Sequence, residues 1–494
     1  MIDGIEDITP GKFKSWTNAI DFRDGFDSLV VNVHDSGEYD YYILWMARRQ
    51  SGYSASEGRL SLNDVLSPTF NTRSEKRLRQ DGVIGGLHSA SSFVPALNFV
   101  ETAIAVVDYT SWFKKNEDAR RSIMTRGRMM QATDANSFRT ELEQHYWDTT
   151  DDLTEFGLYA DPGAGSPGYN LLIRVYRIRR NMPITRYADM IHEGDLSTNT
   201  TFDVDPVRYQ SIGMIRQAST GVEIDFNENE STNFYNHCGI RNATTNGTTT
   251  NPPAIDQEED IITTNVRQMD GNIIDIPDTK RSFIFYGGGT TYDPSVCFEK
   301  GTMIGSDPNP ISKVTLKHST SIAGHVKLQR DPIFPFFRMF MDIIYQKRFS
   351  QYDLSTELSI NIPSGYKLVF FRIMLYDDTS STLQAKFNGV TSYTMIRDLN
   401  STGGANHTSD NSTSFGQMFS ETIAKDGQGN FIEGYVHTEP QNNLFGFTYW
   451  NTMRTDQMMF ASGGFSDTTD LSTMELQTTA TSSVNGMVQL FGVP

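Results

Sequence analysis

The chain has 494 residues, with 42 Lys and Arg against 60 Asp and Glu, which gives a formal net charge of −18. A surface of this charge repels polyphosphate, so nonspecific nucleic-acid binding over the whole surface is disfavoured and any such contact must be local. Two cysteines exclude a disulfide framework. Cys238 and Cys297 are one disulfide, two free thiols or two buried small apolar residues, and we favour the last.

The amino terminus has no basic stretch followed by an apolar one, so we expect no secretory signal and a chain that stays in the compartment where it is made. Residues 28–33 (SLVVNV) and 41–46 (YYILWM) predict strands, and the Asp-Ser-Gly between them favours a hairpin. From about residue 61 to 147 the apolar spacing predicts a helix-rich insertion. Its most apolar part, residues 93–107, is too short to span a membrane.

A strand at 170–178 follows, and about 190–264 is expected to be a loop-rich surface insertion. The second half predicts more strands, at 282–286, 313–318, 325–328, 358–362 and 367–376, the last two as a hairpin. An aromatic helix is expected at 336–349, buried on two sides. The acidic tail at 401–494 has enough aromatic residues to be ordered. No repeat with a period of 20 to 50 residues occurs.

Catalytic signatures are absent from the sequence. There is no HExxH and no Gly-x-Ser-x-Gly, and the nine histidines form no cluster with cysteine. His34, Asp35 and Tyr39 resemble the His-Asp site of phospholipase A2, but three residues separate Asp35 from Tyr39 where that family has two, and a polar turn is the better interpretation. We therefore predict no catalytic residue and no enzyme. A pair of carboxylates for glycosidase chemistry stays open, because their separation depends on the fold.

Basic residues gather locally at 171–188, where no acidic residue interrupts them. Such a patch favours either contact with packaged nucleic acid or pairing with acidic groups of the same or a neighbouring subunit. The candidate nucleic-acid contacts are Arg174, Arg177, Arg179 and Arg180.

Acidic side chains are dense at Asp148, Asp151 and Asp152, which makes them weak candidates for a structural Ca²⁺, although a solvated charge run is the better explanation. No other cofactor is expected. Aromatic residues are enriched where subunits bury each other. The candidate subunit contacts are Phe336, Phe337, Phe340, Tyr345, Phe349 and Trp450.

The strand runs at 28–33, 41–46, 170–178, 282–286 and 313–376, joined by loops rich in Asn, Thr and Gly, give a chain that resembles the capsid proteins of small non-enveloped viruses. It is most similar to the shell proteins of densoviruses and bidensoviruses, single-stranded DNA viruses of invertebrates. It lacks their glycine-rich amino-terminal stretch and a matching phospholipase segment.

This resemblance implies one viral jelly-roll domain over residues 1–494, an eight-stranded antiparallel β-sandwich enlarged by insertions. It also implies self-assembly of many copies into an icosahedral shell, a packaged genome of single-stranded DNA, a host receptor, and a place in the virion after assembly inside the host cell. The alternatives from other classes are a β-rich glycan-binding or glycan-hydrolysing protein and a phage head or tail structural protein.

Overall fold

The structure of the protein is a computed structural model. The described residues are 5–11, 14, 20–21, 29–35, 37–49, 56–63, 70–79, 82–91, 94–99, 104–115, 121–131, 138–147, 151–160, 168–179, 189–195, 200–203, 209–216, 222–227, 235–243, 247–251, 255–256, 259–262, 268–274, 281–288, 297–304, 312–317, 324–330, 341–377, 381–401, 408–410, 419–422, 430–438, 444–454, 457–479 and 483–494.

Within these ranges the protein is mainly β, and its strands form six antiparallel sheets that belong to three successive stretches of the chain. We call these stretches unit 1, unit 2 and unit 3. Each unit has one large sheet and one small, four-stranded sheet. The sequence instead predicts one enlarged sandwich.

Unit 1 contains thirteen strands. They are β1 (Ile5–Asp7), β2 (Ile20–Asp21), β3 (Leu29–Asp35), β4 (Tyr39–Arg49), β5 (Ser56–Leu62), β6 (Phe70–Arg79), β7 (Gly82–Ser91), β8 (Val94–Phe99), β9 (Ile104–Lys115), β10 (Arg121–Gln131), β11 (Phe138–Trp147), β12 (Leu153–Ala160) and β13 (Gly168–Arg179). The large sheet has the order β1-β13-β4-β9-β10-β11-β6-β7, with β2 also paired to β13, and the small sheet has the order β3-β12-β5-β8.

Unit 2 repeats this plan. Its strands are β14 (Asp189–Asp195), β15 (Thr200–Asp203), β16 (Tyr209–Arg216), β17 (Val222–Phe226), β18 (Tyr235–Ala243), β19 (Gly247–Asn251), β20 (Ile255–Asp256), β21 (Glu259–Ile262), β22 (Gln268–Ile274), β23 (Arg281–Gly288), β24 (Cys297–Ile304), β25 (Lys313–Lys317) and β26 (Gly324–Arg330). The orders are β14-β26-β16-β22-β23-β24-β18-β19, with β20 beside β18, and β15-β25-β17-β21.

Unit 3 has the plan once more. Its strands are β27 (Asp342–Asp353), β28 (Leu358–Asn361), β29 (Leu368–Asp377), β30 (Thr382–Phe387), β31 (Tyr393–Ser401), β32 (Thr408–Asp410), β33 (Phe419–Thr422), β34 (Asn430–His437), β35 (Leu444–Arg454), β36 (Gln457–Ser466), β37 (Thr473–Thr478) and β38 (Ser483–Val493). The large sheet runs β27-β38-β29-β34-β35-β36-β31-β32 and the small sheet β28-β37-β30-β33.

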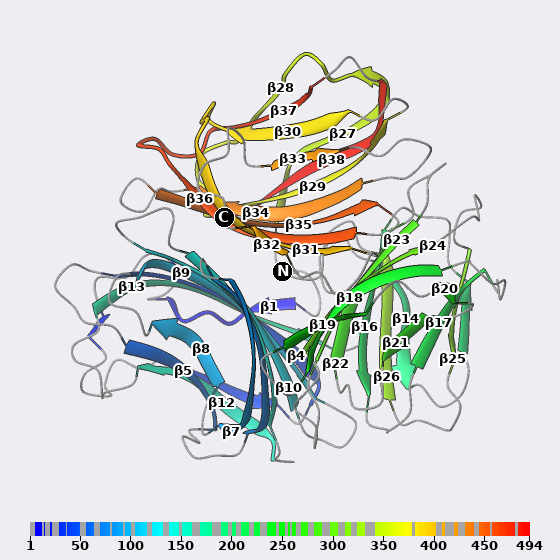
Figure 1. Ribbon diagram of the computed structural model, residues 1–494. Helices are drawn as coiled ribbons and strands as arrows, with labels where there is room; N and C mark the ends of the chain where they lie inside the picture. The colour runs from blue at the N-terminus through cyan, green and yellow to red at the C-terminus, as the bar shows by residue number, and fades with distance from the viewer. Residues whose placement is uncertain are drawn as a thin grey trace.

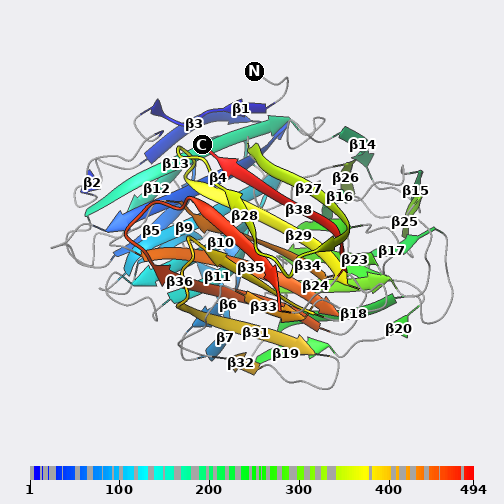
Figure 2. The ribbon, with the colours of Figure 1, turned by 90° about the horizontal axis from the view of Figure 1, so that it is seen from above.

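The three units lie around a common centre (Figure 1). Unit 1 is drawn in blue and cyan, unit 2 in green and unit 3 in yellow to red. Seen from above, unit 3 lies over the other two, and the carboxyl terminus lies on the side of β1 and β13 (Figure 2).

The core of unit 3 lies between its two sheets and is aromatic. Phe387 of the small sheet lies with its ring centre 6.3 Å from that of Phe371 and 5.9 Å from that of Phe465, both on the large sheet. Phe445 stacks on Phe465 at 4.9 Å. All four rings are buried. Because burial of one such side chain contributes about 1.5–3 kcal/mol, this cluster stabilises the contact between the sheets strongly.

The prediction of helices from the sequence is wrong. Residues 61–147 contain β6 to β11, and residues 342–349 belong to β27, while residues 336–340 lie outside the described part of the chain. Among the described residues there is no α-helix, and none that is long and apolar enough to cross a bilayer. The reason for the error is geometric: residues four apart share a face in a helix and also in a strand, so a short pattern fits both.

The two predicted hairpins are also wrong, although their strands are confirmed. β3 belongs to the small sheet and β4 to the large sheet, and β28 and β29 are divided in the same way. The short turns therefore carry the chain from one sheet to the other. Asp35 closes the first turn, since its Oδ1 accepts hydrogen bonds from the backbone N–H of Gly37 and Glu38, both at 2.7 Å. The region 190–264, expected to be loop-rich, contains the strands β14 to β21.

Candidate functional site

The basic strand β13 is the candidate site that the sequence singles out, and it lies inside a sheet. β1 and β2 pair with one side of it and β4 with the other. Successive side chains of a strand point to opposite faces, so its arginines are divided between two environments. Arg174 and Arg177 are half-buried, Arg179 is exposed, and Arg180 lies outside the described residues.

Arg177 forms an ion pair with Glu6 of β1. Its Nη2 and Nε both donate to Glu6 Oε2, at 2.6 Å and 2.8 Å, and its guanidinium lies 4.8 Å from the ring centre of Tyr39. Partial burial lowers the pKa of Arg177, but the hydrogen bonds and charge of Glu6 outweigh this and raise it above its ordinary value. The charge of Arg177 is therefore already compensated within the chain.

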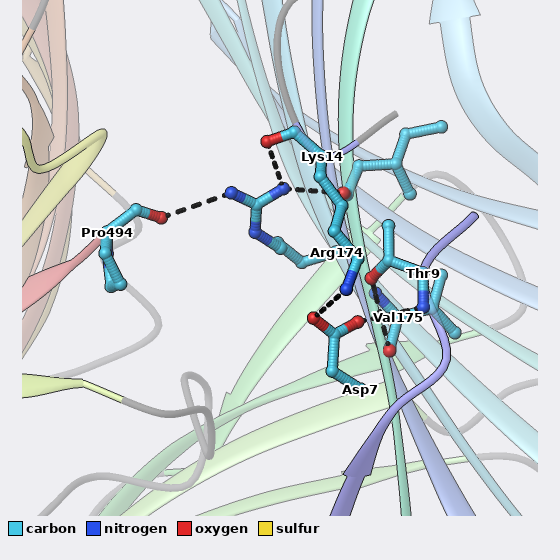
Figure 3. Close-up of polar contacts among 7 residues, drawn as sticks. Asp7, Thr9, Lys14, Arg174, Val175 and Pro494 are labelled. Atoms are coloured by element: carbon cyan, nitrogen blue, oxygen red, sulfur yellow. Dashed lines mark hydrogen bonds and ion pairs between the residues drawn. The ribbon is translucent and has the colours of Figure 1, made fainter. Parts of the chain in front are cut away.

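Arg174 connects three segments through backbone oxygens (Figure 3). Its Nη1 donates to the carbonyl of Lys14 at 2.7 Å and to that of Ile173 at 3.3 Å, while Nη2 lies 3.5 Å from the oxygen of Pro494. Residue 14 precedes β2 in unit 1, and Pro494 follows the last strand of unit 3. One side chain of β13 thus joins unit 1 to unit 3.

The segment after β1 continues to pair with β13 through a threonine. Ile8 N–H donates to the carbonyl of Val175 at 2.9 Å, and Val175 N–H donates to Thr9 Oγ1 at 2.8 Å. Asp7 holds this segment in place, because its Oδ1 accepts from Thr9 N–H at 2.9 Å and its Oδ2 from Lys14 Nζ at 2.8 Å (Figure 3). Partial burial raises the pKa of Asp7, but these hydrogen bonds outweigh it and hold the pKa below its usual value.

The candidate calcium ligands lie at the start of β12. Asp151 and Asp152 are exposed, and Asp148 lies outside the described residues. Within the described ranges no group of three or more His, Cys, Asp or Glu side chains is arranged to hold a metal ion. The carbonyl of Asp152 instead accepts a hydrogen bond from Asn63 Nδ2 at 2.8 Å.

Three of the six candidate subunit contacts, Tyr345, Phe349 and Trp450, lie on strands of unit 3. Phe349 is only 3% exposed and packs 5.0 Å from Tyr352, so its ring is buried within the chain. Tyr345 is half-buried on β27, next to the aromatic pair over which Lys347 lies. Trp450 is on β35, but its side chain is not among the described ones. The described residues do not include Phe336, Phe337 and Phe340.

Sequence reasoning missed an asparagine that recurs once in each unit. Asn63, Asn227 and Asn388 follow β5, β17 and β30, and each has a positive φ, between 48° and 56°. Asparagine tolerates this left-handed conformation better than other residues with a side chain.

Each of these asparagines accepts hydrogen bonds from the start of the neighbouring strand of the small sheet, which is β12, β25 or β37 in the three units. Asn388 Oδ1 accepts from Ser472 N–H at 2.9 Å, Thr473 N–H at 3.1 Å and Ser472 Oγ at 3.1 Å. Asn63 makes the same contacts to residues 154–155 and Asn227 to residues 312–313. We call this arrangement the asparagine corner. The sequence signal of the asparagine corner has two parts: an Asn directly after Leu or Phe, and, far downstream, a Ser or Thr two residues before an apolar residue. This pair of signals recurs about every 160 residues.

Comparison with known proteins leaves the family open. No protein-family model matches the chain, and no curated protein sequence matches it. Among solved structures, the PBSX exported protein XepA is 7% identical with a TM-score of 0.12, covering 64% of this chain and 89% of its own. PNGF-II is 7% identical with a TM-score of 0.16 (92% and 99%), and the insecticidal delta-endotoxin Cry8Ea1 from Bacillus thuringiensis is 8% identical with a TM-score of 0.12 (92% and 53%). Similarity at this level carries no argument about fold or function.

Proposed function

We propose that the protein is a structural shell protein, a capsid protein that self-assembles into an icosahedral particle, and that each of its three units is an enlarged jelly roll. The observation that carries the proposal is the connectivity, repeated three times. In unit 3, four strands of the large sheet, in the order β27-β38-β29-β34, face the small sheet in the order β28-β37-β30-β33. When the two inserted hairpins are left aside, the chain changes sheet at every connection except the one from β30 to β33, which are neighbours in the small sheet.

This alternation supports the jelly-roll assignment, because two Greek keys wound into a double sheet place the first and last strands side by side. The remaining strands, β35, β36, β31 and β32, lengthen the large sheet beyond β34. They come from two insertions, one between the small-sheet strands β30 and β33 and the other between β34 and β37. Viral shell domains and lectins both use this architecture.

The charge of the chain determines how a genome would be held. With a net charge of −18, bulk neutralisation of packaged single-stranded DNA is excluded, and contacts come from local basic groups. Of the four proposed arginines, Arg177 is paired with Glu6 and Arg174 is held by backbone carbonyls. Arg179 is exposed and is the most available of the three described arginines.

Size-exclusion chromatography followed by negative-stain electron microscopy tests the proposal. We expect closed particles of megadalton mass when the purified chain is concentrated at neutral pH. A chain that stays a lone soluble molecule at high concentration contradicts the proposal, and cleavage or specific binding of a glycan polymer by that molecule favours the glycan-active alternative.

A second experiment tests the genome contacts. The double variant Arg179→Ala with Arg180→Ala is expected to form particles that protect less nucleic acid from nuclease than the wild type. Arg348→Ala, an exposed arginine on β27 of unit 3, is the matched control and should leave the protected amount unchanged. Equal protection in all three proteins removes the assignment.

A further inference from the structure

The three units are related by more than their strand order. Each has the same twelve-strand path between a large and a small sheet, and each has its asparagine corner at the corresponding place, after the fourth strand of the common path. The corners are about 160 residues apart. Two independent features, connectivity and a local hydrogen-bonding motif, therefore relate unit 1 to unit 2 and unit 2 to unit 3.

The units also touch one another through corresponding strands. We call these nine strands the ring strands: β6, β7 and β11 of unit 1, β18, β19 and β24 of unit 2, and β31, β32 and β36 of unit 3. In each unit they are the last three strands of the large sheet, at the end away from the first strand of the unit.

Every unit contacts both of the others. β7 lies against β18, β19 and β32, β31 lies against β6 and β18, and β36 lies against β11 and β18. The contacts therefore form a closed ring, and Figure 1 shows the three units arranged around a common centre. Closed contacts between corresponding surfaces are what a homotrimer with threefold symmetry has.

We infer that one chain closes this ring by itself and stands where a trimer of one-unit chains would otherwise stand. The covalent connections between units make ring closure an intramolecular event, so it does not depend on protein concentration. The ring strands are then occupied within the chain, and contacts between copies use other surfaces. The number of copies in a particle rests on the shell function proposed above. An icosahedral particle would then contain about 60 three-unit chains, where one-unit chains would number about 180.

The mass of the building block tests the inference directly. Light scattering on particles dissociated by mild pH or salt, or on the chain before assembly, should give 55.6 kDa, the mass of one chain. A stable trimer, of about three times that mass, would overturn the inference. If closed particles form, their mass should be on the order of 3 MDa, and a mass on the order of 10 MDa would also overturn it.

These results distinguish the shell proposal from the inference of a ring within one chain. A block of one chain that forms no closed particle removes the shell proposal and leaves the ring in place. A trimeric block within closed particles removes the ring and leaves the shell proposal.

Cleavage of the connections between units provides a second test. Protease sites are inserted between β13 and β14, in residues 180–188, and between β26 and β27, in residues 331–340. After cleavage of the folded full chain, the three fragments should still elute together with the mass of one intact chain, and the uninserted chain treated with the same protease is the control. Elution as separate fragments would show that the ring strands do not hold the units together.

Discussion

Arg372 and Glu433 face each other across β29 and β34 and form an ion pair from which water is excluded. Arg372 Nε lies 3.0 Å from Glu433 Oε2, and the two side chains are 2% and 0% exposed. Gln489, in register with Arg372 on β38, is buried beside them and donates through Nε2 to Gln346 Oε1 at 2.9 Å. A row of polar side chains thus crosses the large sheet of unit 3.

Breaking this ion pair is expected to cost more than removing it. Glu433→Leu or Arg372→Met alone leaves a buried charge without its counter-ion, which typically lowers the free energy of unfolding by about 3–5 kcal/mol. The double variant removes both charges and should recover most of that loss. Denaturant titration of the four proteins measures the cycle, and Arg348→Met, at an exposed position, is the control. A double variant no more stable than either single variant would contradict the prediction.

The asparagine corner of unit 3 is expected to tolerate glycine better than alanine at position 388. Asn388→Gly keeps the positive φ but loses the acceptor of three hydrogen bonds, at a cost of about 1–2 kcal/mol. Asn388→Ala adds the strain of a left-handed alanine, about 1–2 kcal/mol more. Asn361→Ala, at an exposed asparagine on β28, should change the free energy of unfolding little. Denaturant titration compares the variants, and equal effects of the two substitutions at position 388 would show that the backbone conformation costs nothing.

Asp467 makes the same region sensitive to acid. Partial burial raises its pKa, but hydrogen bonds from Asn388, Thr469 and Thr468 outweigh this and lower the pKa below the ordinary value of 3.8. A carboxylate whose pKa is lowered by folding contributes stability above the pKa of the unfolded chain, and this contribution is lost as the pH falls through the folded value.

The difference in the free energy of unfolding between the wild type and Asp467→Asn should therefore be largest at neutral pH and shrink as the pH falls from about 5 to about 3. Denaturant titrations across this range measure it. A difference that is independent of pH would show that the carboxylate charge contributes nothing.

Two glycines of unit 3 with positive φ are expected to respond differently to alanine. At Gly486, with φ of 131°, an added Cβ would lie 1.9 Å from the carbonyl oxygen of Met374, a backbone atom in the neighbouring strand. At Gly365, with φ of 104°, the space around the Cβ is open, so only backbone strain remains. Gly486→Ala should therefore lower the melting temperature at least twice as much as Gly365→Ala. Similar shifts would indicate that β38 moves away from β29 at little cost.

Much of the β content could be predicted from the sequence, because runs such as residues 28–33 and 367–376 combine β-branched and aromatic residues between turn signals. Which strand each of them pairs with could not be predicted. The turn at 35–38 suits a hairpin, yet it joins two sheets, and only the packing of both sheets on one core decides between these outcomes. The helices were wrong because a spacing of four residues is shared by both kinds of element.

The repeat of three units escaped the sequence for a different reason. Its period of about 160 residues is marked only by an asparagine and a distant Ser or Thr, and neither stands out in a chain rich in both. The basic patch was visible in the sequence. That Arg177 pairs with Glu6, 171 residues away, was not, because such a pairing depends on β1 lying beside β13.

The ring contained in a single chain changes what one mutation does. In an assembly of three identical polypeptides every substitution appears in all three subunits at once, whether or not each position in the ring tolerates it. Here a codon change alters one unit and leaves the other two as they were. Evolution can accordingly adapt unit 1, unit 2 and unit 3 to separate tasks, and an engineer can place a single tag or epitope per ring.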